Sequence, residues 1–119
     1  MAGISVPVVL IPRFTTYLGA ADFLSYALDV SAYDALRLTV WRAPLVGTSP
    51  VFGLSTYESL DRVTWVECLG PQDEDPGAQS EVQYEWRFQS RWFRLRLALG
   101  GTQPGVTCWA QGFFTKRER

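Results

Sequence analysis

The densest group of side chains that could do chemistry is the acidic run Asp73-Glu74-Asp75-Pro76-Gly77. Carboxylate oxygens suit hard cations such as Ca²⁺, which takes six or more oxygen ligands. The spacing is not that of an EF-hand, and the Pro-Gly pair is typical of a solvated turn. Adjacent exposed carboxylates also give no reason for the separated pKa values that an acid/base pair needs. We therefore expect a turn here, with no bound metal.

The residue types that the sequence lacks restrict its chemistry further. There is no His and no Asn, and Lys116 is the one Lys beside ten Arg. These absences exclude a Ser-His-Asp triad, an imidazole metal ligand and an N-glycosylation site, and they leave no place for a P-loop lysine. The sequence therefore favours a protein that is not an enzyme and that carries no cofactor.

The two cysteines, Cys68 and Cys108, stand far apart and form no CxxC signature of a redox or zinc site. We expect two buried, reduced thiols that pack as small apolar side chains, with a Cys68–Cys108 disulfide as the alternative. The apolar stretch 4–11 lacks a preceding basic region and contains Pro7, so we expect no signal peptide and synthesis in the cytoplasm.

Composition bounds the class of protein. The 119 residues carry 11 Lys+Arg against 12 Asp+Glu and are 47% hydrophobic, which suits one ordinary domain with its own core rather than a disordered chain. No apolar run reaches about 18 residues, so we expect no membrane partner. The slightly acidic balance argues against a nucleic-acid partner.

Alternation of apolar and polar residues at period two dominates the chain, most clearly in 82–88 and 93–99. This pattern is typical of strands with one buried and one wet face. Turn-forming residues separate the alternating runs by about 8–12 residues, which favours a sandwich or barrel. The expected strands are 8–11, 15–18, 24–30, 36–41, 51–57, 62–68, 82–88, 93–99 and 106–113, with breaks that include 43–50 and 100–105.

The sequence therefore predicts an all-β protein, a jelly-roll-like β-sandwich of eight or nine strands with little helix. We expect an extended apolar N-terminal arm over residues 1–12, the sandwich domain over 13–114, and a basic tail over 115–119. The prolines of the arm confine it to a sheet edge or to a place outside the sheet. Whether the arm packs on its own domain or on a neighbouring subunit stays open.

One strand pairing can be predicted in register. A hairpin of 82–89 with 92–99 around Ser90-Arg91 would put all apolar partners on one side and place Glu85 opposite Arg96. Ser-Arg is a poor two-residue loop, so the alternative is a bend at this point, after which the chain continues in another sheet.

Charge is segregated along the chain. Residues 67–85 contain six acidic residues and no base, and four arginines follow within 87–96. These segments could neutralise each other within one subunit or between subunits, or they could form solvated faces.

The seventeen aromatic residues are more than a small core readily hides. Rings in phase with aliphatic neighbours are predicted to be core: Phe14, Phe23, Phe52, Tyr84, Trp86, Phe88 and Phe93. Rings out of phase or near strand ends are predicted to lie at the surface, each of them most simply at a partly buried rim position: Trp41, Trp92, Trp109, Tyr17, Tyr33 and Tyr57. Exposed Trp and Tyr anchor protein interfaces and also stack against sugars.

We predict a protein interface built from the apolar arm, the arginine-bearing strand and the out-of-phase tryptophans. Its residues are Val8, Val9, Leu10, Ile11, Trp41, Trp92, Arg94, Arg96 and Trp109.

Two stretches resemble the galactose-binding-like sandwiches of the discoidin type. They are 52–67 (FGLSTYESLDRVTWVE), which is similar to the strand–turn–strand pattern of that family, and 90–97 (SRWFRLRL), which resembles its arginine-bearing strand. The resemblance implies a jelly-roll sandwich and assigns no ligand.

The small size, the excess of Arg over Lys, the apolar arm and the lack of catalytic residues resemble virion proteins of tailed phages, in particular capsid decoration or cement proteins. This second resemblance implies a virion location, a capsid or other virion protein as partner, and a homo-oligomer. The alternative function that we consider is a carbohydrate-binding module of jelly-roll type.

Overall fold

The computed structural model describes residues 3–68 and 72–117, and within them the protein is built from strands without helix. No helix in this part of the chain is long and apolar enough to cross a membrane. The all-β, jelly-roll-like prediction is thereby confirmed. The strands are β1 (Gly3–Leu18), β2 (Ala21–Leu24), β3 (Leu28–Asp29), β4 (Ala35–Arg42), β5 (Val46–Ser59), β6 (Val66–Glu67), β7 (Val82–Arg87) and β8 (Trp92–Arg117).

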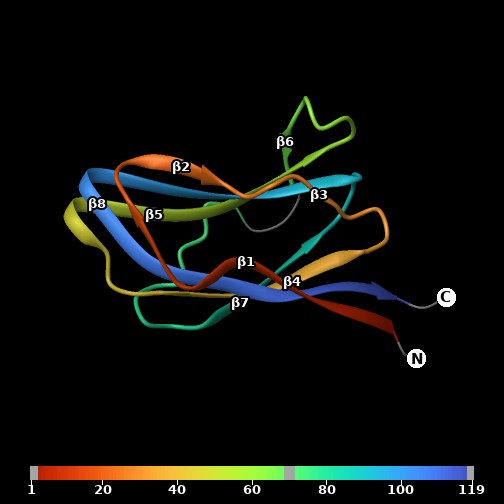
Figure 1. Ribbon diagram of the computed structural model, residues 1–119, viewed down its shortest axis with the longest axis horizontal. Helices are drawn as coiled ribbons and strands as arrows, with labels where there is room; N and C mark the ends of the chain where they lie inside the picture. The colour runs from red at the N-terminus through yellow and green to blue at the C-terminus, as the bar shows by residue number, and fades with distance from the viewer. Residues whose placement is uncertain (1–2, 69–71, 118–119) are drawn as a thin grey trace.

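The strands form two layers that share β8 (Figure 1). In the first layer, the C-terminal half of β8 lies between β1 and β4, and β7 pairs with the far side of β4. In the second layer, the N-terminal half of β8 lies between β5 and the short strands β2 and β3, and β6 extends β5. The sheet is therefore curled into a sandwich whose layers join at the bend of β8.

The segment 100–105 was expected to be a break between two strands, but β8 runs through it as one strand of 26 residues. Gly101 (φ 108°) and Gln103 (φ 50°) adopt left-handed conformations there, and a Cβ on Gly101 would lie 2.8 Å from the Ser49 carbonyl oxygen. Glycine therefore allows the strand to turn a corner while β1 and β5 follow it on either side.

The core lies between the two layers. Phe93 and Leu97 of the second layer and Leu36 and Leu38 of the first are almost fully buried, as the period-two pattern predicted. The prediction for Phe14 is wrong, because this side chain is 63% exposed. Irregular pairing of β1 between Ile11 and Thr15, with φ 60° at Phe14, changes the phase of the strand at this point.

The predicted hairpin of 82–89 with 92–99 does not form. Strand β7 pairs with β4, with Trp86 opposite Leu36, whereas β8 pairs with β5. The alternative, in which the chain bends and continues in the other layer, is confirmed. Glu85 consequently pairs with Arg37 at 3.0 Å and not with Arg96.

A buried carboxylate holds the crossing between the layers. Glu58 is 2% exposed, and its Oε1 accepts hydrogen bonds from the backbone amides of Gln89 (2.6 Å) and Ser90 (3.0 Å). Hydrogen bonds of this kind compensate the cost of burying the charge.

The first and the last described residues belong to the first layer. Residues 3–12 lie in β1, an edge strand that pairs antiparallel with β8 of the same chain, so the prolines lie on a sheet edge. Thr115 and Arg117 lie in β8, and the last residues of the expected tail, 118–119, are outside the described residues. The strand expected over 62–68 is reduced to Val66–Glu67.

Gly112 offers a test of the close approach between β8 and β4. A Cβ at this position would collide with the backbone carbonyl of Arg37 and lie 2.9 Å from the Cα of Leu38. We expect Gly112→Ala to lower the free energy of unfolding by about 3 kcal/mol or more, because neither strand can move without disrupting the sheet.

The matched control is Gly100→Ala, whose added Cβ would meet only the Cβ of Val51 at 3.8 Å. Urea unfolding at pH 7 measures both variants. Equal losses for the two would contradict the close approach.

Candidate interaction surfaces

The described residues contain no group of three or more His, Cys, Asp or Glu side chains placed to hold a metal ion. Cys68 and Cys108 are both buried and not bonded to each other, as predicted. Burial raises the pKa of each thiol to about 12, so neither is a thiolate at neutral pH.

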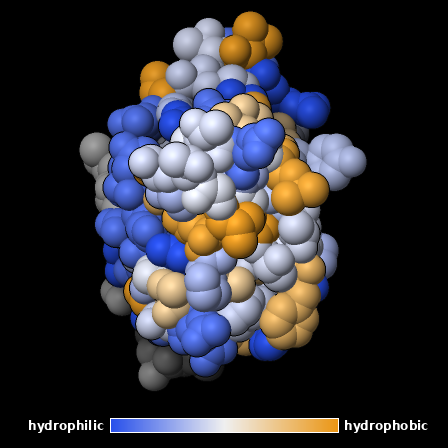
Figure 2. Space-filling view, turned by 90° about the vertical axis from the view of Figure 1, so that its left-hand side faces the viewer, coloured by the Kyte–Doolittle hydropathy of each residue, from blue (hydrophilic) through white to orange (hydrophobic). Residues whose placement is uncertain are grey.

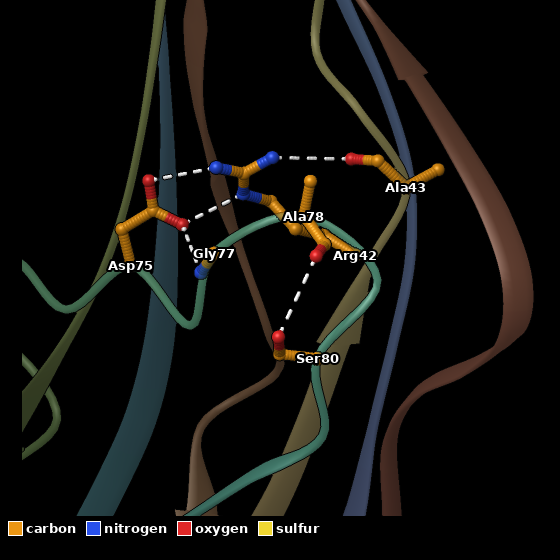
Figure 3. A network of polar contacts seen from close by, with 6 residues as sticks. All are labelled: Arg42, Ala43, Asp75, Gly77, Ala78 and Ser80. Atoms are coloured by element: carbon orange, nitrogen blue, oxygen red, sulfur yellow. Dashed lines mark hydrogen bonds and ion pairs between the residues drawn. The ribbon is translucent and has the colours of Figure 1, made fainter.

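The acidic run has a structural partner. The guanidinium of Arg42 donates hydrogen bonds to both carboxylate oxygens of Asp75, at 2.6 and 2.9 Å, and to the Ala43 carbonyl (Figure 3). The backbone amide of Gly77 donates a further bond to Asp75 at 3.0 Å. The hydrogen bonds from Arg42, and to a smaller extent the bond from Gly77, hold the pKa of Asp75 below its usual value.

This network anchors the segment 72–80 across one side of the sandwich. Glu74 exchanges backbone hydrogen bonds with Leu54 of β5, and Gln79 donates one to the Arg42 carbonyl of β4. The segment therefore bridges the two layers and closes the sandwich on this side.

The outer face of the second layer carries a group of rings and guanidinium groups that we name the arginine–aromatic face: Tyr57, Trp65, Trp92, Arg94 and Arg96. On β8, these outward residues alternate with Phe93 and Leu95 of the core. Arg94 lies opposite Tyr57 of β5 in the sheet register. The alternation predicted from the sequence thus places Trp92, Arg94 and Arg96 together on one face.

The loop between β5 and β6 completes this face. The guanidinium of Arg62 lies 4.6 Å from the ring centroid of Trp92, and that of Arg94 lies 4.3 Å from the ring of Trp65. Such cation–π contacts stabilise the guanidinium groups while leaving N–H groups available. Arg62 and Trp65 were not singled out from the sequence as interface residues, although both lie in the 52–67 stretch that carries the family resemblance.

Hydrogen bonds fix the loop in place. The Ser59 hydroxyl accepts bonds from the amides of Asp61 and Arg62, and the Asp61 carboxylate accepts bonds from Val63 (2.8 Å) and Thr64 (2.9 Å). The bonds from the Thr64 and Val63 amides lower the pKa of Asp61. Because the backbone is tied down in this way, Arg62 is held over Trp92.

Two of the arginines on and around this face are neutralised within the chain. Arg91 pairs with Asp29 at 2.9 Å, and Arg96 lies 3.6 Å from Asp22. Hydrogen bonds from Ser31 and then Arg91 lower the pKa of Asp29 to about 2. In the part of the chain that the structure describes, Arg62 and Arg94 have no carboxylate within ion-pair distance.

The outer face of the first layer differs, because β1 covers its tryptophan. Trp109 is only 3% exposed, beneath the guanidinium of Arg13 at 4.3 Å, so the expectation that this ring lies at the surface is wrong. Trp41 is half-buried and packs edge-on against Phe14, with centroids 5.7 Å apart. The irregular segment of β1 places Arg13 and Phe14 over both rings.

The predicted arm residues separate because the pairing of β1 shifts register between Val9 and Ile11. Val9 points outward and is 58% exposed, while Ile11 is buried in the core. Val8 and Leu10 are half-buried against that core. The nine predicted interface residues thus lie on two opposite outer faces and in the core, not on one surface.

An open groove lies on the side of the sandwich opposite the segment 72–80. It has a volume of about 610 Å³ and runs between β1, from Val9 to Ile11, and the edge formed by β2 and β3. Its lining is mostly apolar, and Asp22 is its one charged residue.

The end where β8 bends carries a smaller apolar patch. Figure 2 shows this end, with hydrophobic side chains gathered near the middle and polar ones around them. Leu18 and Val46, both largely exposed, lie opposite Gly105 from its two neighbouring strands.

Comparison with known proteins gives a fold and no family. No family model and no curated protein matches the sequence. Among solved structures, the chain is similar to a chain in the structure of the infectious bursal disease virus Gx strain, with a TM-score of 0.67 and 6% sequence identity. The match covers 97% of this chain and 32% of the viral chain. It is also similar to T=1 particles derived from infectious bursal virus (0.66, 8%, 97% and 32%) and to the VP2 subviral particle of infectious bursal disease virus (0.64, 7%, 97% and 33%).

These similarities show a shared β fold. The chain spans about one third of the length of the viral chains that it matches.

We expect Asp75→Asn to lower the free energy of unfolding by about 1 kcal/mol at pH 7, because the Arg42 guanidinium loses its charged acceptor while Asp75 itself is partly exposed. The folded pKa of Asp75 lies below 3.8, so its contribution is complete above that value and is lost as the pH falls through the folded pKa. Urea unfolding should therefore show a gap between wild type and variant at pH 6–7 that shrinks below about pH 4.

The control is Asp73→Asn, which removes an exposed carboxylate that has no ion pair among the described residues. It should leave stability unchanged at every pH. If the difference in free energy of unfolding between wild type and Asp75→Asn stays constant down to pH 3, the ionised Asp75 carboxylate is not the stabilising partner of Arg42.

Proposed function

We propose that this chain is a non-enzymatic structural component of a virus particle, which decorates or cements a capsid through protein–protein contacts. The observation that supports the proposal most strongly is the fold, because 97% of the chain superposes on capsid-type chains of infectious bursal disease virus particles. A phage origin is a narrower part of this proposal and rests on composition alone.

The arginine–aromatic face is the surface that we propose for contact with the capsid. Trp and Arg are the residues most enriched at the energetic centres of protein interfaces. Here Trp92 and Arg94 are half-buried in the isolated chain and held by stacking, so little side-chain freedom is lost on binding.

The carbohydrate-binding alternative needs a free ring face on which a sugar can stack. Trp92 already contacts the guanidinium groups of Arg62 and Arg91, and Trp65 contacts that of Arg94. We therefore favour a protein partner over a glycan for this face.

The test is addition of the purified protein to virus particles that were assembled without this protein, from a virus whose gene for it has been deleted. Co-sedimentation in a density gradient should show saturable binding of the wild-type protein to the particles. Trp92→Ala should weaken binding by about thirtyfold or more, since it removes the ring at the centre of the face.

The matched control is Phe14→Ala, which removes an exposed ring from the outer face of the other layer and should bind normally. Absence of the chain from particles made with the intact gene, or equal binding by wild type and Trp92→Ala, would contradict the proposal. Circular dichroism verifies that both variants are folded.

A further inference from the structure

The loop between β5 and β6 exposes apolar side chains on a rigid backbone. Leu60 and Val63 are 79% and 80% exposed, and Val66 at the end of the loop is also exposed. In Figure 1 this loop rises from the second layer, away from the first. Backbone amides of the loop donate hydrogen bonds to the side chains of Ser59 and Asp61 and so hold the loop in a conformation that leaves these apolar side chains exposed.

The open groove between β1 and the β2–β3 edge has the complementary character. Leu10, Phe23 and Leu28 line the groove and pack against the hydrophobic core. Leu24 and Tyr26 also line it. Leu24 is 50% exposed and Tyr26 is 91% exposed, so apolar surface of the groove is left uncovered in the single chain.

The charges of the loop and the groove also match. Arg62 is the cation between Leu60 and Val63, and no carboxylate pairs with it among residues 3–68 and 72–117. Asp22 is the one charged residue that lines the groove. Its carboxylate lies 3.6 Å from Arg96 of the same chain, and its side chain remains 58% exposed. The neighbouring Asp61 forms no ion pair with Arg62 in this part of the chain, and its Oδ1 accepts the backbone hydrogen bonds that fix the loop.

The loop and the groove lie at opposite edges of the second layer, whose order is β2 and β3, then β8, β5 and β6. One copy can therefore offer its loop to one neighbour and its groove to another. Head-to-tail contacts generate a closed ring when the rotation that relates successive copies brings the last copy back to the first.

We propose that copies of this chain associate head to tail, with the 60–66 loop of one copy in the β1/β2–β3 groove of the next and Arg62 facing Asp22. This inference deepens the proposed function by naming a neighbour in the assembly, and it rests on that function for its biological setting. A single loop buries less than the roughly 800 Å² per partner of a stable complex, so the contact is weak in solution and depends on many copies.

Sedimentation velocity from about 5 to 500 µM tests the association, a range that covers weak, transient contacts. The wild-type protein should show a mass that rises with concentration. The loop variant Leu60→Asp/Val63→Asp and the groove variant Leu24→Asp/Tyr26→Asp should each remain monomeric, with unchanged circular dichroism because all four side chains are at least half exposed.

Mixing the two variants separates this geometry from any symmetric contact. The groove variant keeps an intact loop and the loop variant keeps an intact groove, so a 1:1 mixture should give a heterodimer and nothing larger. The matched control Val51→Asp places the same charge at an exposed aliphatic position outside both surfaces and should associate like the wild type.

The charge pair is tested by a double-mutant cycle. Arg62→Gln and Asp22→Asn should each weaken association by about tenfold, and the two substitutions in one chain should weaken it no further. A wild-type protein that is monomeric at every concentration, or a variant mixture that stays monomeric, would overturn the inference.

Monomeric variants that still bind virus particles would leave the proposed function standing without the head-to-tail contact. Self-association through the loop and groove in a protein that is absent from particles would show the reverse.

Discussion

The hydrogen bonding of β8 is the constraint on which the rest of the molecule depends. This strand of 26 residues pairs with β1, β2, β3, β4 and β5, so both layers are attached to one continuous backbone. The bend around Gly101 lets the strand leave one layer and enter the other without a break in pairing. Because the layers cannot slide past each other, the outward residues of each half of β8 hold fixed positions.

Stacking of guanidinium groups on indole rings shapes both outer faces, with opposite results. On the first layer, the irregular segment of β1 lies flat and Arg13 seals Trp109 from solvent. On the second layer, the loop after β5 is held by its own hydrogen bonds, with Arg62 exposed and Trp92 half-buried. The same interaction therefore accompanies a buried tryptophan on one face and a half-buried one on the other.

The two sides of the sandwich are also unlike. The ion pair between Arg42 and Asp75 holds the segment 72–80 across one side, whereas the opposite side keeps an apolar groove. One side of the molecule is closed and the other is open, and the loop projects from one edge of the second layer. The two edges of that layer are therefore not equivalent. This asymmetry is the structural basis of the head-to-tail association that we propose.

The sequence by itself determined the all-β class, the buried face of 93–99 and the shared outward face of Trp92, Arg94 and Arg96, because alternation along a strand is a local property. Only the tertiary structure decided that β7 pairs with β4, that Trp109 is covered and that Phe14 is exposed. Pairing and coverage depend on segments far away in the sequence, and an irregularity such as 12–14 resets the phase with no clear sign in the composition. Arg62 and Trp65 joined the face for the same reason, since a loop's position is set by the sheet it returns to and not by its own pattern.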